Sequence, residues 1–190
     1  AMGSRGAALL DDYRDVAHNG LVVETPETMN QDIPRYAAMG WQVAVHAIGD
    51  RGAQNVLNAF EKISADDRGK TRPRLEHAQM VDDRNLARFA ELGVIASVQP
   101  IHLFSDAAWI DEALDPEHLR RLFRWRDLAD CTRLSGGSDF PIEDPNPWHG
   151  ISVAMTRKHA GGRVFHVEQC LNRHEALSLY TTDAAFAGLS

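Results

Sequence analysis

The sequence predicts an α/β fold in which parallel strands alternate with helices. Short apolar runs over residues 41–48, 73–78, 94–99 and 133–138 are typical of strands, and segments with an apolar stripe at helical spacing separate them. Strands that are mostly apolar belong to parallel βαβ units, because helices cover both faces of such a sheet. With 190 residues, we expect a single domain over residues 1–190.

The composition is that of a globular protein. Apolar residues make up 44% and charged residues 25%, which excludes a disordered chain or a fibrous repeat. The net charge of −7 argues against a general nucleic-acid surface, and no apolar run reaches the ~20 residues of a membrane helix. We therefore expect neither nucleic acid nor membrane as a partner. Arg120, Arg121, Arg124 and Arg126 alternate with apolar residues and indicate the solvated face of an amphipathic helix.

The first elements lie before residue 41. Residues 20–24 form a short extended run. Thr25 is expected to cap the helix that follows, with Pro26 in its first turn. Pro34 lies inside this helix and is expected to kink or restart it before Gly40, because proline removes a backbone donor and clashes with the preceding turn.

Capped helices follow the first two strands. The first strand is predicted to be buried. Asp50 is expected to cap the helix that follows this strand. After the second strand, over residues 73–78, either Asp82 or Asp83 is expected to cap a helix that ends at Gly93.

The second half of the chain continues the alternation. After the third strand, a long loop leads through Pro116 into a helix that runs to about Ala129. A proline-rich loop over residues 140–147 follows the fourth strand. Further helices are expected near residues 150–157 and 174–187.

Three strands end in a residue that can bind a metal. His46 ends the first strand, His77 the second and Asp139 the fourth, with gaps of 77 − 46 = 31 and 139 − 77 = 62 residues. A (β/α)8 barrel of about 250 residues uses about 31 residues per βα module. The three residues therefore occupy equivalent places in the first, second and fourth of four modules. In such barrels the active groups cluster at the carboxyl ends of the strands.

Imidazole nitrogen and carboxylate oxygen suit Zn²⁺ or a similar divalent ion. Such an ion lowers the pKa of water toward about 7, and a nearby carboxylate can carry the proton to a leaving group. From spacing alone, however, each histidine is equally well explained as a packing residue, and Asp139 as a turn residue. Spacing leaves both interpretations open.

Five stretches resemble known sequences. They are Gly3-Ser4-Arg5-Gly6-Ala7-Ala8-Leu9, Trp41-Gln42-Val43-Ala44-Val45-His46-Ala47-Ile48-Gly49-Asp50-Arg51, Leu75-Glu76-His77-Ala78-Gln79, Ser97-Val98-Gln99-Pro100 and Gly137-Ser138-Asp139-Phe140-Pro141. Together they resemble the metal-dependent amidohydrolase superfamily. The resemblance is greatest to amidohydrolase family 3, the YtcJ-like proteins related to N-substituted formamide deformylase.

The resemblance implies a partial (β/α)8 TIM barrel, about strands five to eight with their flanking helices. It implies that His46 and His77, from the fifth and sixth strands, bind metal. Asp139, from the eighth, would touch the metal and act as the catalytic proton shuttle. The implied cofactor is one or two divalent ions, with Zn expected, and the implied reaction is hydrolysis of a carbon–nitrogen bond, such as an amide, in a small molecule.

The sequence also departs from the family pattern. It contains no H-x-H pair, which relatives carry on the first strand, and no bridging residue from a fourth strand. We therefore expect the C-terminal half of a barrel, truncated at both ends, to be a poor or inactive catalyst by itself. Its open strand edges favour homo-oligomers. Two isolated cysteines favour a cytoplasmic protein.

Other residues are weaker candidates. His102, after the third strand, is expected to face the same mouth and contact substrate, with packing as an equal alternative. Arg51 and His149, the latter expected on a loop downstream of Asp139, are further candidates for substrate binding. Glu76 is expected to point away from His77 and to pair with a cation on a helix.

Two other functions remain open at this point. One is a non-catalytic protein that keeps the βα scaffold for association only. The other is a metal-dependent phosphoesterase, which uses similar ligands. The motifs of nucleotide-binding loops and serine hydrolases do not occur in the sequence.

Overall fold

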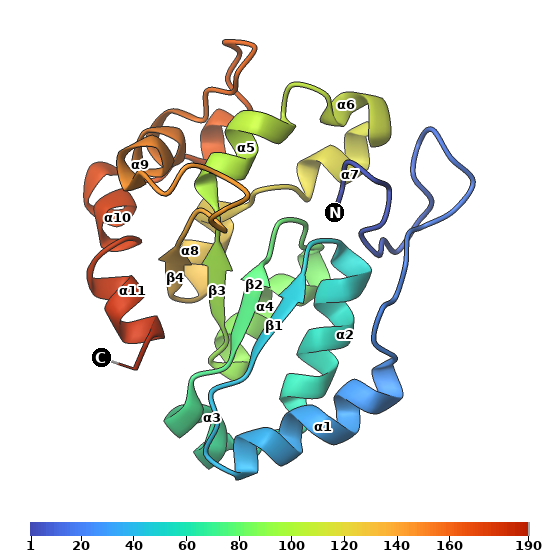
Figure 1. The fold of residues 1–190 in the computed structure, drawn as a ribbon, viewed down its shortest axis with the longest axis vertical. Coiled ribbons are helices and arrows are strands. Elements are labelled where there is room, and N and C mark those ends of the chain that lie inside the picture. The colour runs from blue at the N-terminus through green and yellow to red at the C-terminus, as the bar shows by residue number, and fades with distance from the viewer. Residues whose placement is uncertain (190) are drawn as a thin grey trace.

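A computed structural model describes residues 1–189 and confirms the parallel α/β arrangement of a partial barrel. Four parallel strands form one sheet in the sequential order β1-β2-β3-β4. Their bounds are β1 Ala44–Ala47, β2 Arg74–His77, β3 Ile95–Val98 and β4 Leu134–Gly136. All four point the same way, so their carboxyl ends lie at one edge of the sheet, on the side of α5 (Figure 1).

Helices connect the strands and follow the last one. Before β4 lie α1 (Pro26–Ala38), α2 (Asp50–Glu61), α3 (Ala65–Thr71), α4 (Asp83–Leu92), α5 (Pro100–Asp106), α6 (Ile110–Ala113), α7 (Pro116–Arg120) and α8 (Trp125–Cys131). After β4 lie α9 (Pro147–Thr156), the 3₁₀ helix η1 (Val167–Gln169), α10 (Arg173–Ser178) and α11 (Thr182–Ala187). Among residues 1–189, no helix is both long and apolar enough to cross a bilayer.

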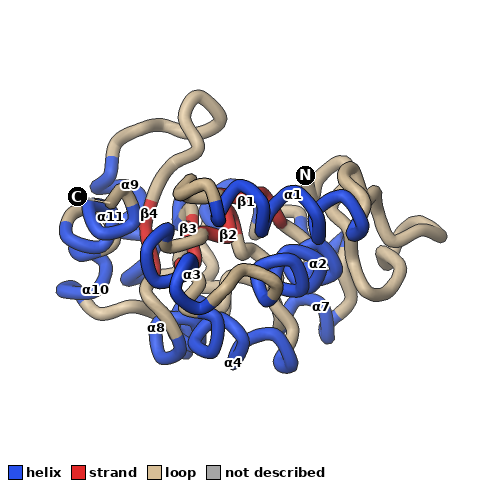
Figure 2. The backbone as a smooth tube through the Cα atoms, turned by 90° about the horizontal axis from the view of Figure 1, so that it is seen from below, coloured by secondary structure: helices blue, strands red, loops and turns tan. Residues whose placement is uncertain are grey.

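The two faces of the sheet differ. Figure 2 shows α2, α4 and α8 on one side of the strands, and α4 packs against both of the others. Leu75, Ala96 and Leu134 are register partners that point to this side and are buried. On the opposite face, His46 pairs with Glu76 and Glu76 with Ser97, and none of these three is buried. The first strand was expected to be buried, but it alternates between the two faces because only one of them is covered.

The first part of the chain differs from its prediction in two places. Residues 20–24 are not a strand, and Val23 is 95% exposed. The helix capped by Thr25 forms as expected, but it continues through Pro34 without restarting. Ile33 and Ala37 are buried on the side of α1 that packs on α2, so tertiary packing offsets the missing hydrogen bond at the proline.

Asp50 is not the predicted helix cap but a buried anchor. Gly49 is the N-cap of α2, and Asp50 is the first helical residue, with a fully buried side chain. One carboxylate oxygen accepts a hydrogen bond from the backbone N–H of Leu10 at 2.9 Å, and the other accepts one from Arg121 Nη1 at 2.8 Å. A Cβ at Gly49 would lie 2.0 Å from the carbonyl oxygen of Ala8. Asp50 therefore anchors the N-terminal segment to α2 and to the end of α7.

The helix predicted from Pro116 to about Ala129 is divided into α7 and α8. Phe123 has a φ of 51° in the turn between them. The arginines of this region were expected to form a solvated face, but three of the four make ion pairs. Their partners are Asp50 and Glu117 for Arg121, Asp83 and Asp127 for Arg124, and Asp130 and Glu175 for Arg126. Several of these acids lie far away in the sequence, so sequence spacing could not reveal them.

The amino ends of the strands are covered by the end of α11. The carbonyl oxygen of Phe186 accepts a hydrogen bond from Arg72 Nη1 at 2.8 Å. That of Ala187 accepts from Arg74 Nη1 at 3.0 Å and from Gln42 Nε2 at 2.8 Å. Cationic donors at a helix C-terminus satisfy carbonyls that have no partner within the helix. This end of the sheet is therefore closed by the chain itself.

The buried Asp50 carboxylate leads to a prediction about stability. Asp50→Ala leaves the Leu10 N–H and one bond of Arg121 without a partner, and we expect it to lower the free energy of unfolding by about 3 kcal/mol. Asp66→Ala is the matched control, because that aspartate is exposed and pairs only with the exposed Lys70. It should cost less than about 0.5 kcal/mol. Urea unfolding followed by tryptophan fluorescence measures both values, and equal losses would contradict the anchoring role.

Candidate active site at the carboxyl ends of the strands

His46 and His77 meet at the carboxyl ends of β1 and β2. Their ring centroids are 4.4 Å apart, with an angle of 70° between the planes. Strand register alone would separate them, because His46 pairs with Glu76 while His77 pairs with Ala47. The backbone breaks this alternation: φ is 76° at His77 and 43° at Ala78. This left-handed turn ends β2 and brings the His77 ring to His46.

The environment of His77 disfavours protonation of its imidazole. The residue is 7% exposed, and its Nδ1 is buried without a hydrogen-bond partner. Burial lowers the pKa of His77 to about 4, with further lowering by the imidazoles of His46 and His102 and an opposing effect of Asp139. Burial also lowers the pKa of His46, although the charges of Asp139 and Glu76 act in the other direction. Both imidazoles are therefore neutral at pH 7, the form that binds metal.

Asp139 lies three residues beyond β4. Its φ is 56°, its side chain is exposed, and its carbonyl oxygen accepts a hydrogen bond from the N–H of Ile142 at 2.8 Å. Its negative charge raises the pKa of both imidazoles, against the lowering by burial. Over residues 1–189, however, no three side chains of His, Cys, Asp or Glu gather closely enough to hold an ion. The structure brings the two histidines together and leaves the carboxylate on the adjacent loop.

His102 also joins the histidine pair. It lies in the first turn of α5, and its ring stacks on that of His77 with centroids 5.7 Å apart and an angle of 15°. Its Nε2 is buried without a partner. The expectation that His102 faces the same mouth agrees with this position, although its contact with substrate stays a prediction.

Arg51 and His149 lie outside the histidine cluster. Arg51 is the second residue of α2, half-buried, and its guanidinium has no ion pair within the described part of the chain. His149 was expected on a loop, but it belongs to α9. There it lines a pocket of about 450 Å³ between α5 and α9, together with Ile101, Phe104, Ser152, Val153, Thr156 and Lys158. Their roles in substrate binding stay predictions.

Glu76 differs from its prediction. It lies on the same face of the sheet as His46, and its Oε1 accepts a hydrogen bond from Arg74 Nε at 2.8 Å. The cation was expected on a helix, but it comes from the same strand, because residues two apart on a strand share a face.

The sequence reasoning missed a polar network behind the histidines. Gln79 Nε2 donates to Asp106 Oδ2 at 2.9 Å, which ties the turn after β2 to α5. Burial raises the pKa of Asp106, and Glu143 adds to the effect. Glu143 accepts from Ser105 Oγ at 2.6 Å, which ties the loop of Asp139 to the same helix. The bonded residues are 27 and 38 positions apart in the sequence, so no local pattern indicates this network.

Two side chains of the site, those of His46 and His77, fit as ligands of a divalent cation. A buried imidazole nitrogen without a protein partner, beside a second neutral imidazole, is the arrangement that a Zn-class ion uses. The third protein ligand of a catalytic zinc site is not in place among residues 1–189. His46 and His77 therefore fit a metal. Asp139 is the carboxylate whose charge acts most on the pKa of both imidazoles.

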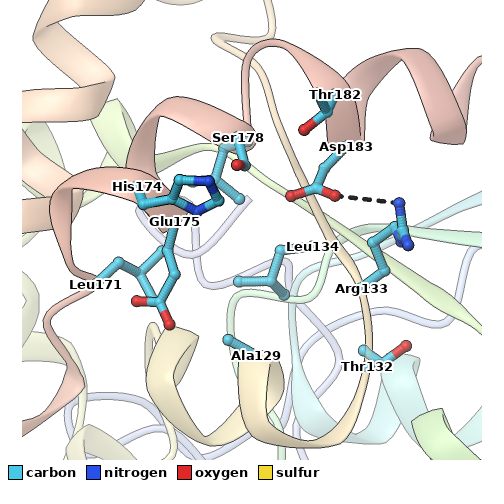
Figure 3. A pocket seen from close by; sticks show the side chains of 11 residues that line it. Ala129, Thr132, Arg133, Leu134, Leu171, His174, Glu175, Ser178, Thr182 and Asp183 are labelled. Carbon is cyan, nitrogen blue, oxygen red and sulfur yellow. Dashed lines mark hydrogen bonds and ion pairs between the residues drawn. The ribbon is translucent and has the colours of Figure 1, made fainter.

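A separate pocket of about 460 Å³ lies on the far side of β4, between α8 and the helices α10 and α11 (Figure 3). Arg133 and Asp183 form an ion pair at 3.3 Å on its rim, and Leu134 and Leu171 line it. None of the predicted site residues contributes to this pocket. The pocket is therefore distinct from the histidine cluster at the carboxyl ends of the strands.

Sequence comparisons identify the relatives of this chain. The model of the amidohydrolase family matches residues 1–188. YtcJ of Bacillus subtilis (strain 168), a protein named as an amidohydrolase, is 36% identical over 190 residues, which cover 97% of this chain and 36% of YtcJ. N-substituted formamide deformylase of Arthrobacter pascens is 29% identical over 158 residues, which cover 80% of this chain and 29% of that enzyme. The chain thus spans about a third of the length of these relatives.

Solved structures give the same result. An uncharacterized metal-dependent hydrolase of Pyrococcus furiosus superposes with a TM-score of 0.86 at 34% identity, over 100% of this chain and 38% of that one. A second such hydrolase, from Pyrococcus horikoshii OT3, superposes with a TM-score of 0.88 at 32% identity, with the same coverage of both chains. Ochratoxinase of A. niger, at 17% identity and a TM-score of 0.57 over 86% of this chain and 34% of that one, shares the fold.

The buried position of His77 leads to a prediction for the metal-free chain. A lowered pKa means that the unfolded chain, with a histidine pKa of about 6.5, binds more protons than the folded one between about pH 4 and 6.5. The stabilising contribution is therefore complete above pH 6.5 and is lost as the pH falls toward 4. NMR titration of the His77 ring protons should give a midpoint near pH 4, and a midpoint above 6 would contradict the buried, unpaired environment.

Proposed function

The chain belongs to the amidohydrolase family, and from this premise we propose that it forms the strand-five to strand-eight part of a metal-dependent hydrolase. The proposed reaction is hydrolysis of a carbon–nitrogen bond in a small molecule. One observation carries this proposal. His46 and His77 place two neutral imidazoles in contact at the carboxyl ends of parallel strands, where barrel enzymes hold their reactive groups.

His46 and His77 are the proposed metal ligands, with Asp139 as the third. The proposed ion is Zn²⁺, because imidazole nitrogens suit it and its tetrahedral sites accept a carboxylate. When bound, such an ion would supply Lewis acidity toward a carbonyl oxygen or water. The low pKa of His77 supports the proposal, because a neutral imidazole needs to lose no proton before it binds a cation.

Asp139 is the proposed proton carrier. Its carboxylate lies on an exposed loop, where it can accept a proton from water and give it to a leaving nitrogen. The loop is attached to α5 by the hydrogen bond between Ser105 and Glu143, which limits how far Asp139 moves from the histidines. The side chains of His102, Arg51 and His149 are proposed to contact substrate.

Amide-type bonds are the preferred substrate class among those that the family scaffold serves. The support comes from the name of the Arthrobacter pascens relative, which specifies N-substituted formamides. A Xaa-Pro dipeptidase is also similar in structure, but at 17% identity that similarity concerns the fold. Non-peptide carbon–nitrogen bonds are therefore proposed first, and phosphate esters serve as the contrasting class in the test.

The 190-residue chain by itself is proposed to be a poor catalyst. Its sequence lacks the H-x-H pair that metal sites of this type use, and the described residues assemble two imidazoles without a third ligand. The outer edge of β1 has no neighbouring strand in the sheet, so self-association through this edge is proposed. The cytoplasm is the proposed compartment.

Metal binding gives the first test. Purified chain dialysed against Zn²⁺ should retain one ion that metal analysis detects and EDTA removes. His46→Ala and His77→Ala should each weaken binding at least about a hundredfold, since each removes a ligand and the cost exceeds that of losing an outer partner. His174→Ala is the matched control, because that histidine is exposed on α10. A folded chain that binds no divalent ion would favour the scaffold function instead.

Turnover gives the second test. The Zn²⁺-loaded chain is incubated with N-formyl amines, N-acyl amino acids and p-nitrophenyl phosphate, with and without EDTA. We expect slow hydrolysis of the amides, sensitive to the chelator and lost in Asp139→Asn, because the amide of asparagine cannot carry the proton. Faster hydrolysis of the phosphate ester would instead identify a phosphoesterase.

A further inference from the structure

We propose that His102 is a positioning residue for the histidine pair: its ring, stacked on that of His77, keeps the His77 imidazole facing His46. This inference rests on the proposed metal site, because it concerns the orientation of one of its ligands. It assigns a role to α5, which lies above the carboxyl end of β3 (Figure 1).

The ring of His77 needs support from outside its own hydrogen bonds. Metal-binding histidines generally donate their second ring nitrogen to a carboxylate or carbonyl oxygen, which fixes the plane of the ring. In this chain neither ring nitrogen of His77 has a hydrogen-bond partner among the described residues, whichever of the two faces the ion, and Nδ1 is fully buried. The orientation of the ring must therefore be held by packing.

Two imidazoles provide that packing from two directions. His46 meets the His77 ring at 70° with centroids 4.4 Å apart, and His102 lies nearly parallel to it at 15° and 5.7 Å. Rotation of His77 about its side-chain bonds would move its ring away from the parallel face of His102. His102 thus lies against the face of the His77 ring. His102 therefore supports a ligand, in addition to its proposed contact with substrate.

The helix that carries His102 is fixed to the segment that carries His77. Asp106, one turn after His102, accepts the hydrogen bond from Gln79, which lies two residues after His77. The carbonyl oxygen of Phe104 accepts a bond from the N–H of Ala160 at 2.9 Å, and α5 packs on α9. The distance between the two rings is thus set by a rigid connection on both sides.

The nitrogens of His102 are not what the packing uses. Its Nε2 is buried without a hydrogen-bond partner. A phenyl ring of similar shape at this position would keep the stacking and remove the unsatisfied atom. The proposal therefore separates two variants: His102→Phe keeps the function of the ring, whereas His102→Ala removes it.

The first measurement uses the metal-free chain. Cross-relaxation between ring protons of His46 and His77 in NMR spectra reports whether the two rings face each other. We expect the signal in the original chain and in His102→Phe, and its loss in His102→Ala. Retention of the signal in His102→Ala would overturn the proposal, whatever the chain does with metal.

The second measurement is the affinity for Zn²⁺ and the visible spectrum of bound Co²⁺. His102→Ala should bind Zn²⁺ about tenfold more weakly and change the Co²⁺ spectrum, while His102→Phe should stay within about threefold. His174→Ala serves again as the control for loss of an exposed histidine. Equal losses in the Phe and Ala variants would show that a nitrogen is required and would overturn the stacking role.

Failure of this inference is distinguishable from failure of the proposed function. If the original chain binds no metal, the proposed function fails, and the cross-relaxation measurement still decides the role of His102. If the original chain and His102→Ala bind metal equally well, the function stands and the positioning role is rejected. Thermal unfolding of every variant confirms that the comparison is between folded chains, with His102→Leu replacing the alanine variant where the latter does not fold.

Discussion

The left-handed turn at the end of β2 is the constraint on which the site depends. Without positive φ at His77 and Ala78, the alternation of the strand would place the two histidines on opposite faces of the sheet. Such a conformation costs a residue other than glycine about 1–2 kcal/mol, so the surroundings must hold it. The geometry of the site is therefore obtained at the expense of local backbone stability.

The segment after the turn is held by hydrogen bonds to three other parts of the chain. The N–H of Met80 donates to the carbonyl oxygen of Ile48 at 2.9 Å, and that of Val81 donates to Arg121 at 3.0 Å. The carbonyl oxygen of Gln79 accepts from Phe123 at 2.7 Å, while its side chain donates to Asp106. These contacts bind the turn to the loop after β1, the turn between α7 and α8, and α5. A strained backbone persists where its neighbours determine it in this way.

Arg121 connects this arrangement to the N-terminal segment. Its carbonyl oxygen accepts a hydrogen bond from the N–H of Val81, and its guanidinium donates one to the buried carboxylate of Asp50. The same carboxylate accepts a hydrogen bond from the N–H of Leu10. The motif Gly49-Asp50 after the first strand is thus explained by packing, since glycine admits the carbonyl of Ala8 and aspartate anchors both segments. The carboxyl ends of β1 and β2 are supported by the same hydrogen-bond network. A change in this network would therefore alter the positions of both histidines.

The sequence by itself determined the parallel α/β fold, the number and approximate place of the strands, the positions of His46 and His77 at strand ends, and that of Asp139 shortly after the fourth strand. These features depend on local periodicity and on the length of a βα module, which neighbours in the chain specify. Only the tertiary structure decided that one face of the sheet is covered and the other open, that the arginines after Pro116 are paired, and that His102 stacks on His77. It also decided that Asp139 lies on an exposed loop and that no three potential metal ligands gather among the described residues. Such features depend on groups from distant parts of the chain and on the left-handed backbone conformation at His77. The periodicity of the sequence encodes neither of them.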